Sequence, residues 1–339
     1  MNNLITDIDG LFVGNATDEA LKSGTTTLVC REAMVASYAV LGGAPGTRDT
    51  DLLNPDQTVE RIDAITLSGG SAFGLDAAGG AQGWLKQQGR GFAVGPIHVP
   101  IVPAAILFDL ANGGNKDWGD RSPYWDLGWQ SAEQASTHFE LGSHGAGAGA
   151  LIAGIKGGLG SASTRTASGI TIGALVAVNA LGQATMGESA HFWAAPFEQD
   201  GEFGGIGLPG SMPAHVARPF TKMDATKEQG PANGNTTIGI IATDASLTKA
   251  AARRLAIMAH DGFARALWPS HTPMDGDLIF ALSTGAKDLP DEDTAFIELG
   301  ALAAATMARA IARGVYCATP RANDRFPTWQ QKFAAESCA

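Results

Sequence analysis

Glycine is concentrated in clusters along this chain, and these clusters restrict the folds that it can adopt more than any other feature. The 339 residues include 44 glycines. They gather mainly at residues 42–43, 69–70, 79–80, 113–114, 145–160 and 201–210. A glycine lets a backbone approach another backbone or a ligand closely, but it costs conformational entropy on folding. We therefore expect either tightly packed layers or a functional site built from main-chain groups.

A polar loop that runs directly into a β-type segment is the most informative local feature. The sequence Asn233-Gly234-Asn235 favours a turn, and the run from Thr236 to Thr243 favours a strand. These residues alone favour an ordinary loop-to-strand connection. The alternative is self-cleavage, in which the Thr236 hydroxyl attacks the Asn235 carbonyl and hydrolysis of the resulting ester leaves Thr236 with a free amino group. Such a terminus carries nucleophile and base on one residue.

The composition is that of an ordinary globular protein. The hydrophobic content of 45% supports a sizeable core, and the length fits one large or two small domains. A formal net charge of -11, with thinly spread Lys and Arg, predicts no nucleic-acid partner. The three cysteines and seven histidines show no ligand spacing, so we expect no metal and no cofactor. Without a long apolar run or a secretion signal, we expect a cytoplasmic protein with no membrane partner.

Strand-like and helix-like segments alternate along the chain. Before the junction between Asn235 and Thr236, apolar patterning predicts strands at residues 61–67, 99–110 and 170–180 and a helix at residues 72–88. After the Asn235-Thr236 junction it predicts a strand at residues 237–243 and then a helix at 246–262 that Ser246 caps. A second strand follows at 278–283, and a last helix stops at Gly314. This order is typical of half of a layered α/β domain.

Polar residues near the ends of these strands are candidates for chemistry. Asp275 and Asp277 precede the strand at 278–283, and residues two apart on an extended chain point to the same side. Two such carboxylates need cationic or hydrogen-bonding partners, such as the new Thr236 terminus; a solvated turn is the alternative. Asn179 ends an apolar strand, so its amide either donates to a developing oxyanion or forms a hairpin turn.

Lys156 is conspicuous as the single charged residue of the glycine-rich run 145–163. If it is desolvated, its pKa falls and it can stabilise a nearby charge; if it is exposed, it carries no functional meaning. The same run mimics a dinucleotide-binding fingerprint at Gly145-x-Gly147-x-x-Ala150. We discount that motif, because no convincing strand precedes it and no acidic residue lies about twenty residues further on.

Several separate motifs, in order, resemble one family: the self-processing DmpA-type aminopeptidases and β-peptidyl aminopeptidases, with the related hydrolases of nylon (aminohexanoate) oligomers. The similarity covers most of the chain. The matching segments are residues 5–14 (ITDIDGLFVG), 67–75 (LSGGSAFGL), 102–109 (VPAAILFD), 234–238 (GNTTI), 242–245 (ATDA) and 272–277 (TPMDGD).

The resemblance implies a single-domain proenzyme that is cut between Asn235 and Thr236. The products are an α chain, residues 1–235, and a β chain, residues 236–339, which stay associated. Thr236 is then the nucleophile, Asn179 resembles the asparagine that stabilises the oxyanion, and Lys156 resembles the lysine near the nucleophile in the nylon-oligomer hydrolases.

The two acidic residues point to one branch of this family. Asp275 and Asp277 match the acids that hold the nucleophile in the nylon-oligomer hydrolases. The aminopeptidase branch has serine and glutamate at these positions and serine as nucleophile. The chain therefore resembles the nylon-hydrolase branch more closely.

The substrate side departs from the aminopeptidase pattern. Gly70 and Ser71 lie in a strand-turn-helix segment and are candidates for substrate binding, together with Phe108. Phe108 occupies the place of a tyrosine whose hydroxyl helps the oxyanion in the aminopeptidases. Asn179 and main-chain groups would have to take over this role, and loss of one such donor typically costs about a hundredfold or more in rate.

The fold implied by the resemblance is a four-layer α/β/β/α sandwich of the DmpA and ornithine acetyltransferase type, similar to N-terminal-nucleophile hydrolases. Such proteins usually assemble as homo-oligomers, tetramers or larger. The implied activity is hydrolysis of short peptides or amides of ω- or β-amino acids through an acyl-enzyme. Two alternatives stay open: an acyltransferase of the ornithine acetyltransferase type, and a catalytically silent binding protein with the same fold.

Overall fold

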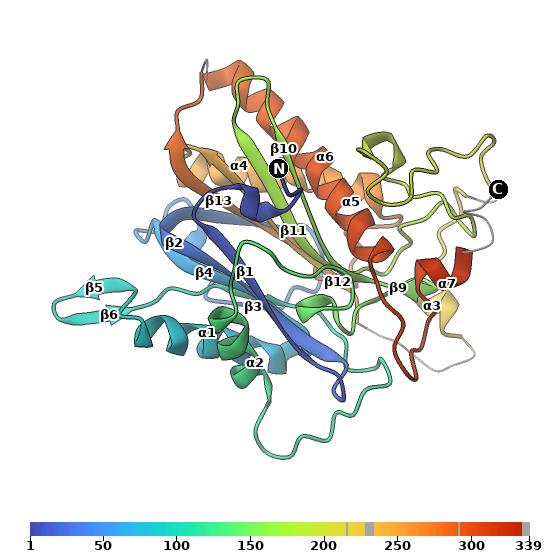
Figure 1. Cartoon of the computed structure of the whole chain (residues 1–339), viewed down its shortest axis with the longest axis horizontal. Coiled ribbons are helices and arrows are strands. Elements are labelled where there is room, and N and C mark those ends of the chain that lie inside the picture. Colours follow the sequence, from blue (N-terminus) through green and yellow to red (C-terminus); the bar gives the residue numbers. More distant parts are fainter. Residues whose placement is uncertain (215, 228–233, 291, 334–339) are drawn as a thin grey trace.

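A bent mixed sheet with helices on both outer sides forms the body of the protein (Figure 1). This computed structural model describes residues 1–339 except 215, 228–233, 291 and 334–339. Among the described residues, nine strands form the main sheet. Its order is β10 (Gly158–Arg165), β11 (Thr171–Asn179), β12 (Thr236–Ala245), β13 (Leu278–Lys287), β2 (Ser23–Val40), β4 (Arg61–Ser68), β7 (Ala104–Ile106) and β3 (Thr47–Arg48), with β1 (Leu11–Asp18) paired to β2.

The long strand β2 joins two halves of this sheet. Its first part pairs with β1 and β4, whereas its last part, residues 35–40, pairs with β13. The register against β4 shifts between Val29 and Met34. Alternate side chains of a strand point to opposite faces. Leu28 therefore lies in the core between the two halves, and Val29 lies in the core under the first two helices.

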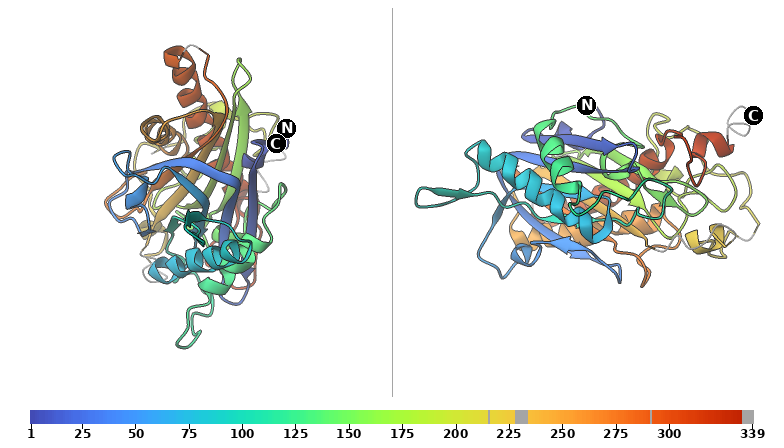
Figure 2. Two further views of the ribbon diagram at one scale, coloured as in Figure 1. Left: turned by 90° about the vertical axis from the view of Figure 1, so that its left-hand side faces the viewer. Right: turned by 90° about the horizontal axis from the view of Figure 1, so that it is seen from below.

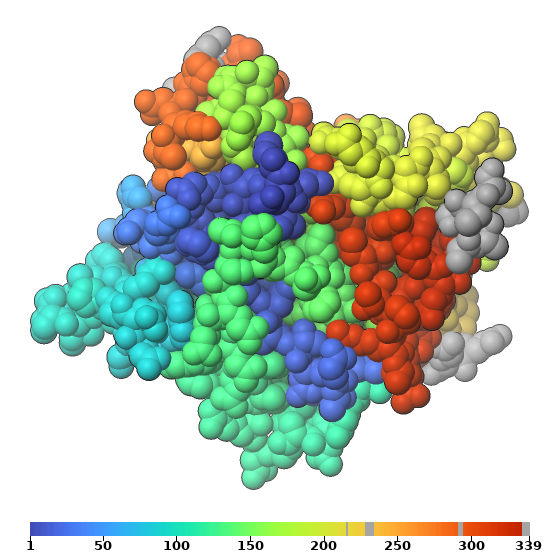
Figure 3. Space-filling view, viewed as in Figure 1, coloured from blue at the N-terminus to red at the C-terminus, as the bar shows by residue number. Residues whose placement is uncertain are grey.

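Helices cover the two outer faces of the sheet (Figures 1 and 2). On β10 to β13 they are α4 (Lys249–Ala259), α5 (Asp261–Ala266) and α6 (Glu292–Tyr316), and on β1, β2 and β4 they are α1 (Asp76–Gln87) and α2 (Tyr124–Glu133). The shorter elements are α3 (Lys222–Ala225), α7 (Trp329–Phe333), the hairpin of β5 (Phe92–Val94) and β6 (Ile97–Val99), and the hairpin of β8 (Leu151–Ile152) and β9 (Ile155–Lys156). Figure 3 shows that segments from the start, middle and end of the chain meet on one face.

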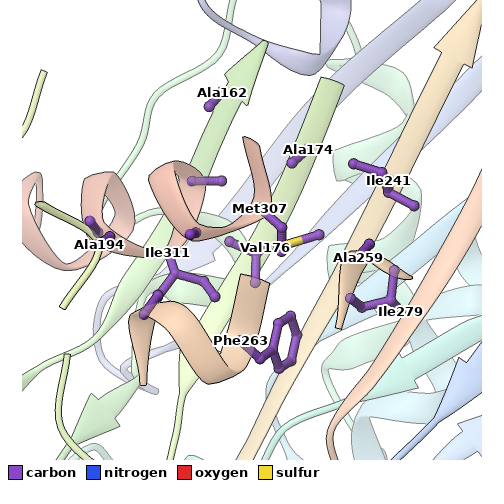
Figure 4. Close-up of a cluster of buried hydrophobic side chains, with 14 of the residues drawn as sticks. Ala162, Ala174, Val176, Ala194, Ile241, Ala259, Phe263, Ile279, Met307 and Ile311 are labelled. Carbon is purple, nitrogen blue, oxygen red and sulfur yellow. The ribbon is translucent and has the colours of Figure 1, made fainter. Parts of the chain in front are cut away.

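Separate apolar cores hold the four layers together. One core packs α4, α5 and α6 against the sheet through residues such as Ile241, Phe263 and Met307 (Figure 4). A second core lies between the two halves of the sheet and includes Ile240, the strand neighbour of Ile241. A third core packs α1 and α2 against β2 and β4. The layer order is therefore helix, sheet, sheet, helix, which confirms the fold expected from the resemblance.

Glycine permits the close approach of these layers. A Cβ atom at Gly160 in β10 would lie 1.8 Å from the carbonyl oxygen of Ala310 in α6. A Cβ atom at Gly80 in α1 would lie 1.9 Å from the carbonyl oxygen of Trp125 in α2. Both distances are far below van der Waals contact, so the tight layering expected from the glycine clusters is present.

Most expected strands are confirmed, and three expectations need correction. The segment 99–110 is not one strand: β6 ends at Val99 and β7 covers only Ala104–Ile106, because Pro100 and Pro103 interrupt the pairing. The helix expected from Ser246 begins later, since Thr248 caps α4 by accepting a hydrogen bond from the Ala251 N–H. The last helix, α6, continues past Gly314 to Tyr316.

Helix α6 is long and apolar. An 18-residue window within Thr294–Tyr316 has a mean hydropathy of 1.5, and by length and composition alone this segment could cross a membrane. However, 61% of that window is buried inside the protein, against β10 and β11. This environment is typical of the core helix of a globular domain.

The contact between α6 and β10 generates a stability prediction. Replacing Gly160 with Ala should destabilise the protein by about 1–3 kcal/mol, because the new methyl group must displace the α6 backbone. The matched control is Gly210→Ala, since a Cβ atom there meets nothing within 4 Å. Urea denaturation measures both variants, and equal midpoints for the two would contradict the packing.

Candidate active site

The peptide bond between Asn235 and Thr236 lies at the start of β12, inside the sheet. Both residues are buried, with 2% and 4% of their surfaces exposed. The Thr236 hydroxyl donates a hydrogen bond to the Asn235 carbonyl oxygen. Asn233, the first residue of the expected turn, lies outside the described residues. The geometry thus places the hydroxyl directly against the carbonyl group that self-cleavage requires it to attack.

Gly276 contributes a main-chain group that the sequence did not reveal as part of the site. Its N–H donates to the Asn235 carbonyl oxygen at 3.0 Å. A Cβ atom on Gly276 would lie 2.7 Å from Thr236 Oγ1, so a side chain here would displace the hydroxyl. The only signal in the sequence was its position between the two candidate acids. A donor on this oxygen can stabilise the negative charge that forms when the carbonyl is attacked.

Asp277 holds the backbone immediately after the junction. Its carboxylate is 1% exposed. Oδ1 accepts the Thr237 N–H at 2.8 Å, and Oδ2 accepts both the backbone N–H and the ring Nδ1 of His271 at 2.9 Å. The carboxylate therefore ties the start of β12 to the loop before β13. Its role in holding a new Thr236 terminus stays a prediction.

Asp275 lies on the other side of Gly276 and is equally buried. It accepts hydrogen bonds from the Leu181 N–H at 3.1 Å and from the Thr272 hydroxyl at 2.5 Å. Burial, and next the nearby Asp277, raise the pKa of Asp275 above its usual value. The alternative of a solvated turn is therefore wrong for both acids, because neither faces solvent.

Asn179 pairs with Thr236 across β11 and β12. Its Nδ2 donates to the carbonyl oxygens of Phe108, at 2.9 Å, and Gly234, at 3.4 Å. In the intact chain this donor thus faces the residue before Asn235, while Gly276 supplies the donor to the Asn235 carbonyl itself. The role of Asn179 at an oxyanion stays a prediction.

Lys156 is buried, as its functional interpretation requires, but its partner is distant from the junction in sequence. Its ammonium group pairs with Asp324 at 2.7 Å. Burial lowers the pKa of Lys156, and Asp324 opposes this effect. The backbone of Lys156 pairs with Leu151, whose N–H donates to Asn179 Oδ1 at 2.9 Å. These contacts therefore connect Lys156 to Asn179 only through the backbone of Leu151. A direct role of the Lys156 ammonium group stays a prediction.

The residues expected to bind substrate fall into two groups. Phe108 lines a cavity of about 10 Å³, enough for about one water molecule, together with Asn179 and Gly234. A Cβ atom on Gly234 would lie 2.2 Å from the Phe108 ring, so the ring packs against the main chain there. Gly70 and Ser71 contact the two chain neighbours of Phe108. The Gly70 N–H donates to the buried Asp109 carboxylate at 2.8 Å, and the Ser71 N–H donates to the Leu107 carbonyl oxygen.

Lys222 is a second buried cation at the site, which the sequence did not reveal. Its ammonium group donates to the backbone oxygen of Asn179 at 3.1 Å and to Oδ1 of the same residue at 3.2 Å. Burial lowers the pKa of Lys222 to about 7, and Asp275 opposes this effect. Among the residues that the structure describes, no group of three or more His, Cys, Asp or Glu side chains is arranged to hold a metal ion.

Comparison with known proteins places this arrangement in one family. The model of peptidase family S58 matches residues 3–325, so the chain belongs to that family. Membership of this family makes the protein a peptidase-type hydrolase. The curated relatives include an uncharacterized aminopeptidase of Mycobacterium tuberculosis (strain ATCC 25618 / H37Rv), which is 40% identical over 349 residues and covers 98% of each protein.

More distant relatives connect the chain to nylon-oligomer hydrolases and to solved aminopeptidases. A 6-aminohexanoate-oligomer endohydrolase of Kocuria sp. (strain KY2) is 28% identical over 298 residues, 84% of this chain and 76% of that protein. The structure of a Burkholderia sp. β-aminopeptidase matches with a TM-score of 0.70 and 19% identity, over 99% of this chain and 93% of that chain. A further structural match is the L-aminopeptidase D-Ala-esterase/amidase from Ochrobactrum anthropi, which is described as a variant of the Ntn hydrolase fold. The TM-score is 0.66 and the identity 18%, and the match covers 98% of this chain and 93% of that chain.

The contacts of Asp277 generate a prediction about chain cleavage. In Asp277→Asn, the amide NH₂ must face one of the N–H donors that the carboxylate now accepts, and hydrogen bonds to a charged group are worth about 1.5–3 kcal/mol. Cleavage at Asn235 should slow about tenfold to a hundredfold in a time course on denaturing gels. The control is Asp9→Asn, which removes an exposed carboxylate paired with Arg31. Equal rates for the two variants would remove Asp277 from this role.

Proposed function

We propose that this protein is a self-cleaving amide hydrolase in which Thr236 first opens its own chain and then acts as the N-terminal nucleophile. One observation carries the proposal: the buried Thr236 hydroxyl contacts the Asn235 carbonyl, whose oxygen also accepts the Gly276 N–H. These contacts support the proposal, because they bring a hydroxyl, a carbonyl group and an N–H donor together at one bond.

Self-cleavage begins when Thr236 Oγ1 attacks the carbonyl carbon of Asn235. The carbonyl oxygen becomes an oxyanion, which the Gly276 N–H stabilises. The C–N bond then breaks, the hydroxyl proton passes to the departing nitrogen, and an ester joins the two residues. Water hydrolyses the ester, leaving a carboxylate on Asn235 and both a hydroxyl and an amino group on Thr236.

The new amino group supplies the base for turnover. Its reference pKa of about 7.7–8.0 lies near working pH, so it can accept the hydroxyl proton as Thr236 attacks a substrate carbonyl. The substrate carbonyl takes the place that Asn235 occupied, within reach of the Gly276 N–H. An acyl-enzyme forms, the amine leaves, and water releases the acid. Asp275 and Asp277 hold the loop and strand that carry these groups.

The groups around Asn179 and the names of the relatives support a proposal for the substrate class. Phe108 offers an apolar ring and Asn179 an amide donor beside Gly234, which suits a short chain with amide groups. Relatives are named as aminopeptidases and 6-aminohexanoate-oligomer endohydrolases. We therefore propose short peptides or amides of ω- or β-amino acids as substrates.

The two chains should stay associated after cleavage. Strand β12 is paired with β11 on one side and with β13 on the other, and it is buried along its whole length. Breaking one peptide bond at its first residue leaves these pairings intact. Assembly into homo-oligomers and a cytoplasmic location remain part of the proposal.

The direct test replaces the nucleophile. Thr236→Ala should give one uncut chain without hydrolase activity, whereas Thr236→Ser should still cut itself and hydrolyse, because it keeps the hydroxyl. Denaturing gels and release of free amine from small amides measure the two outcomes. Release of free acid without an added amine acceptor distinguishes hydrolysis from acyl transfer. A Thr236→Ala protein that is cut or active would overturn the proposal.

A further inference from the structure

The ammonium group of Lys222 is buried without a close counter-ion. Lys222 is 2% exposed and opens the short helix α3. Its backbone N–H donates to the Leu181 carbonyl at 2.7 Å, which fixes the start of its side chain. Both hydrogen bonds of the ammonium group go to Asn179, and no carboxylate of the described residues lies within 4.0 Å of it. Burying a cation in this way is costly, so the contact with Asn179 requires an explanation.

A second buried lysine shows what a purely structural arrangement looks like in this chain. Lys249, which is 7% exposed, donates to three backbone carbonyls, those of Leu52, Gln57 and Val59, at 2.9–3.0 Å. These carbonyls belong to a connecting segment, and Lys249 joins that segment to α4. Lys222 instead directs its hydrogen bonds to one residue of the candidate active site.

The Lys222 contact and the Leu151 N–H together determine which way the Asn179 amide faces. An amide has an acceptor end and a donor end. Oδ1 accepts the Leu151 N–H at 2.9 Å and the Lys222 ammonium at 3.2 Å. With two donors on Oδ1, Nδ2 must point the other way, to the carbonyl oxygens of Phe108 and Gly234. The ammonium charge also polarises the amide and makes Nδ2 a stronger donor.

We propose that Lys222 is a positioning residue for the hydrolysis: it holds Asn179 so that Nδ2 faces the acyl side of the bond that Thr236 attacks. This inference rests on the function proposed above. Lys222 acts only through Asn179, because its hydrogen bonds end on that residue. Asn179 in turn donates to the acyl part of the precursor now, and to the acyl part of a substrate after cleavage.

The variant Lys222→Met tests this role, because it keeps the length of the side chain and removes the donor and the charge. It should fold at least as stably as the wild type, since a buried uncompensated charge is lost. Self-cleavage and kcat/KM on a small amide should each fall about tenfold to a hundredfold. The matched control, Lys249→Met, should lose thermal stability and leave kcat/KM of the folded protein within about threefold of the wild type.

A double-mutant cycle distinguishes positioning from a general structural effect. If Lys222 works through Asn179, adding Lys222→Met to Asn179→Ala should lower the rates by less than about threefold, because the amide that it orients is gone. A full additional loss in that background would overturn the proposal. Unchanged rates in Lys222→Met alone would overturn it as well.

A crystal structure of Lys222→Met supplies a readout that does not depend on activity. The Asn179 side chain should turn away from the Phe108 carbonyl in the variant, whereas an unmoved side chain would contradict the inference. If Thr236→Ala remained active, the proposed function would fail. The orientation of Asn179 in the Lys222→Met structure would still test whether Lys222 positions that side chain. If Thr236→Ala behaved as expected and Lys222→Met were normal, only the inference would fail.

Discussion

The contact between the Thr236 hydroxyl and the Asn235 carbonyl is the interaction on which the rest of the site depends. It exists because β12 begins at Thr236, between β11 and β13, and because Asp277 holds the next backbone N–H. Gly276 then brings its own N–H to the same carbonyl oxygen, with no side chain to push the hydroxyl away. The geometry of this contact is therefore a product of strand pairing and main-chain donors.

Glycines allow close approach of the main chain elsewhere in the fold as well. Gly160 lets α6 lie on β10, and Gly80 lets α1 lie on α2, at distances that any side chain would prevent. At the junction, Gly234 lies against the Phe108 ring in the same way. Close layering of the elements and close approach to the Asn235–Thr236 bond thus have one physical cause. The glycine content of the chain reflects both needs.

Local patterns were sufficient to predict part of this arrangement. The β-branched run after Asn235 predicted β12, and the position of Asp275 and Asp277 before a predicted strand singled out both acids as candidates for the site. Burial and long-range pairing could not be predicted in the same way. Lys222 is buried and donates to Asn179, and no pattern in the sequence around it indicated this contact. The partner of Lys156 lies 168 residues away, where no local pattern could indicate it. The layer order came from the resemblance, since strand and helix signals alone do not determine which faces pack together.

The central claim is that the bond between Asn235 and Thr236 is cut. The masses of the polypeptides in the purified wild-type protein test this claim most directly. Mass spectrometry under denaturing conditions should find two polypeptides, residues 1–235 and residues 236–339. Their summed mass should exceed that of the intact chain by one water, and the shorter one should begin Thr-Thr-Ile-Gly. A single full-length polypeptide in fully active material would contradict the account.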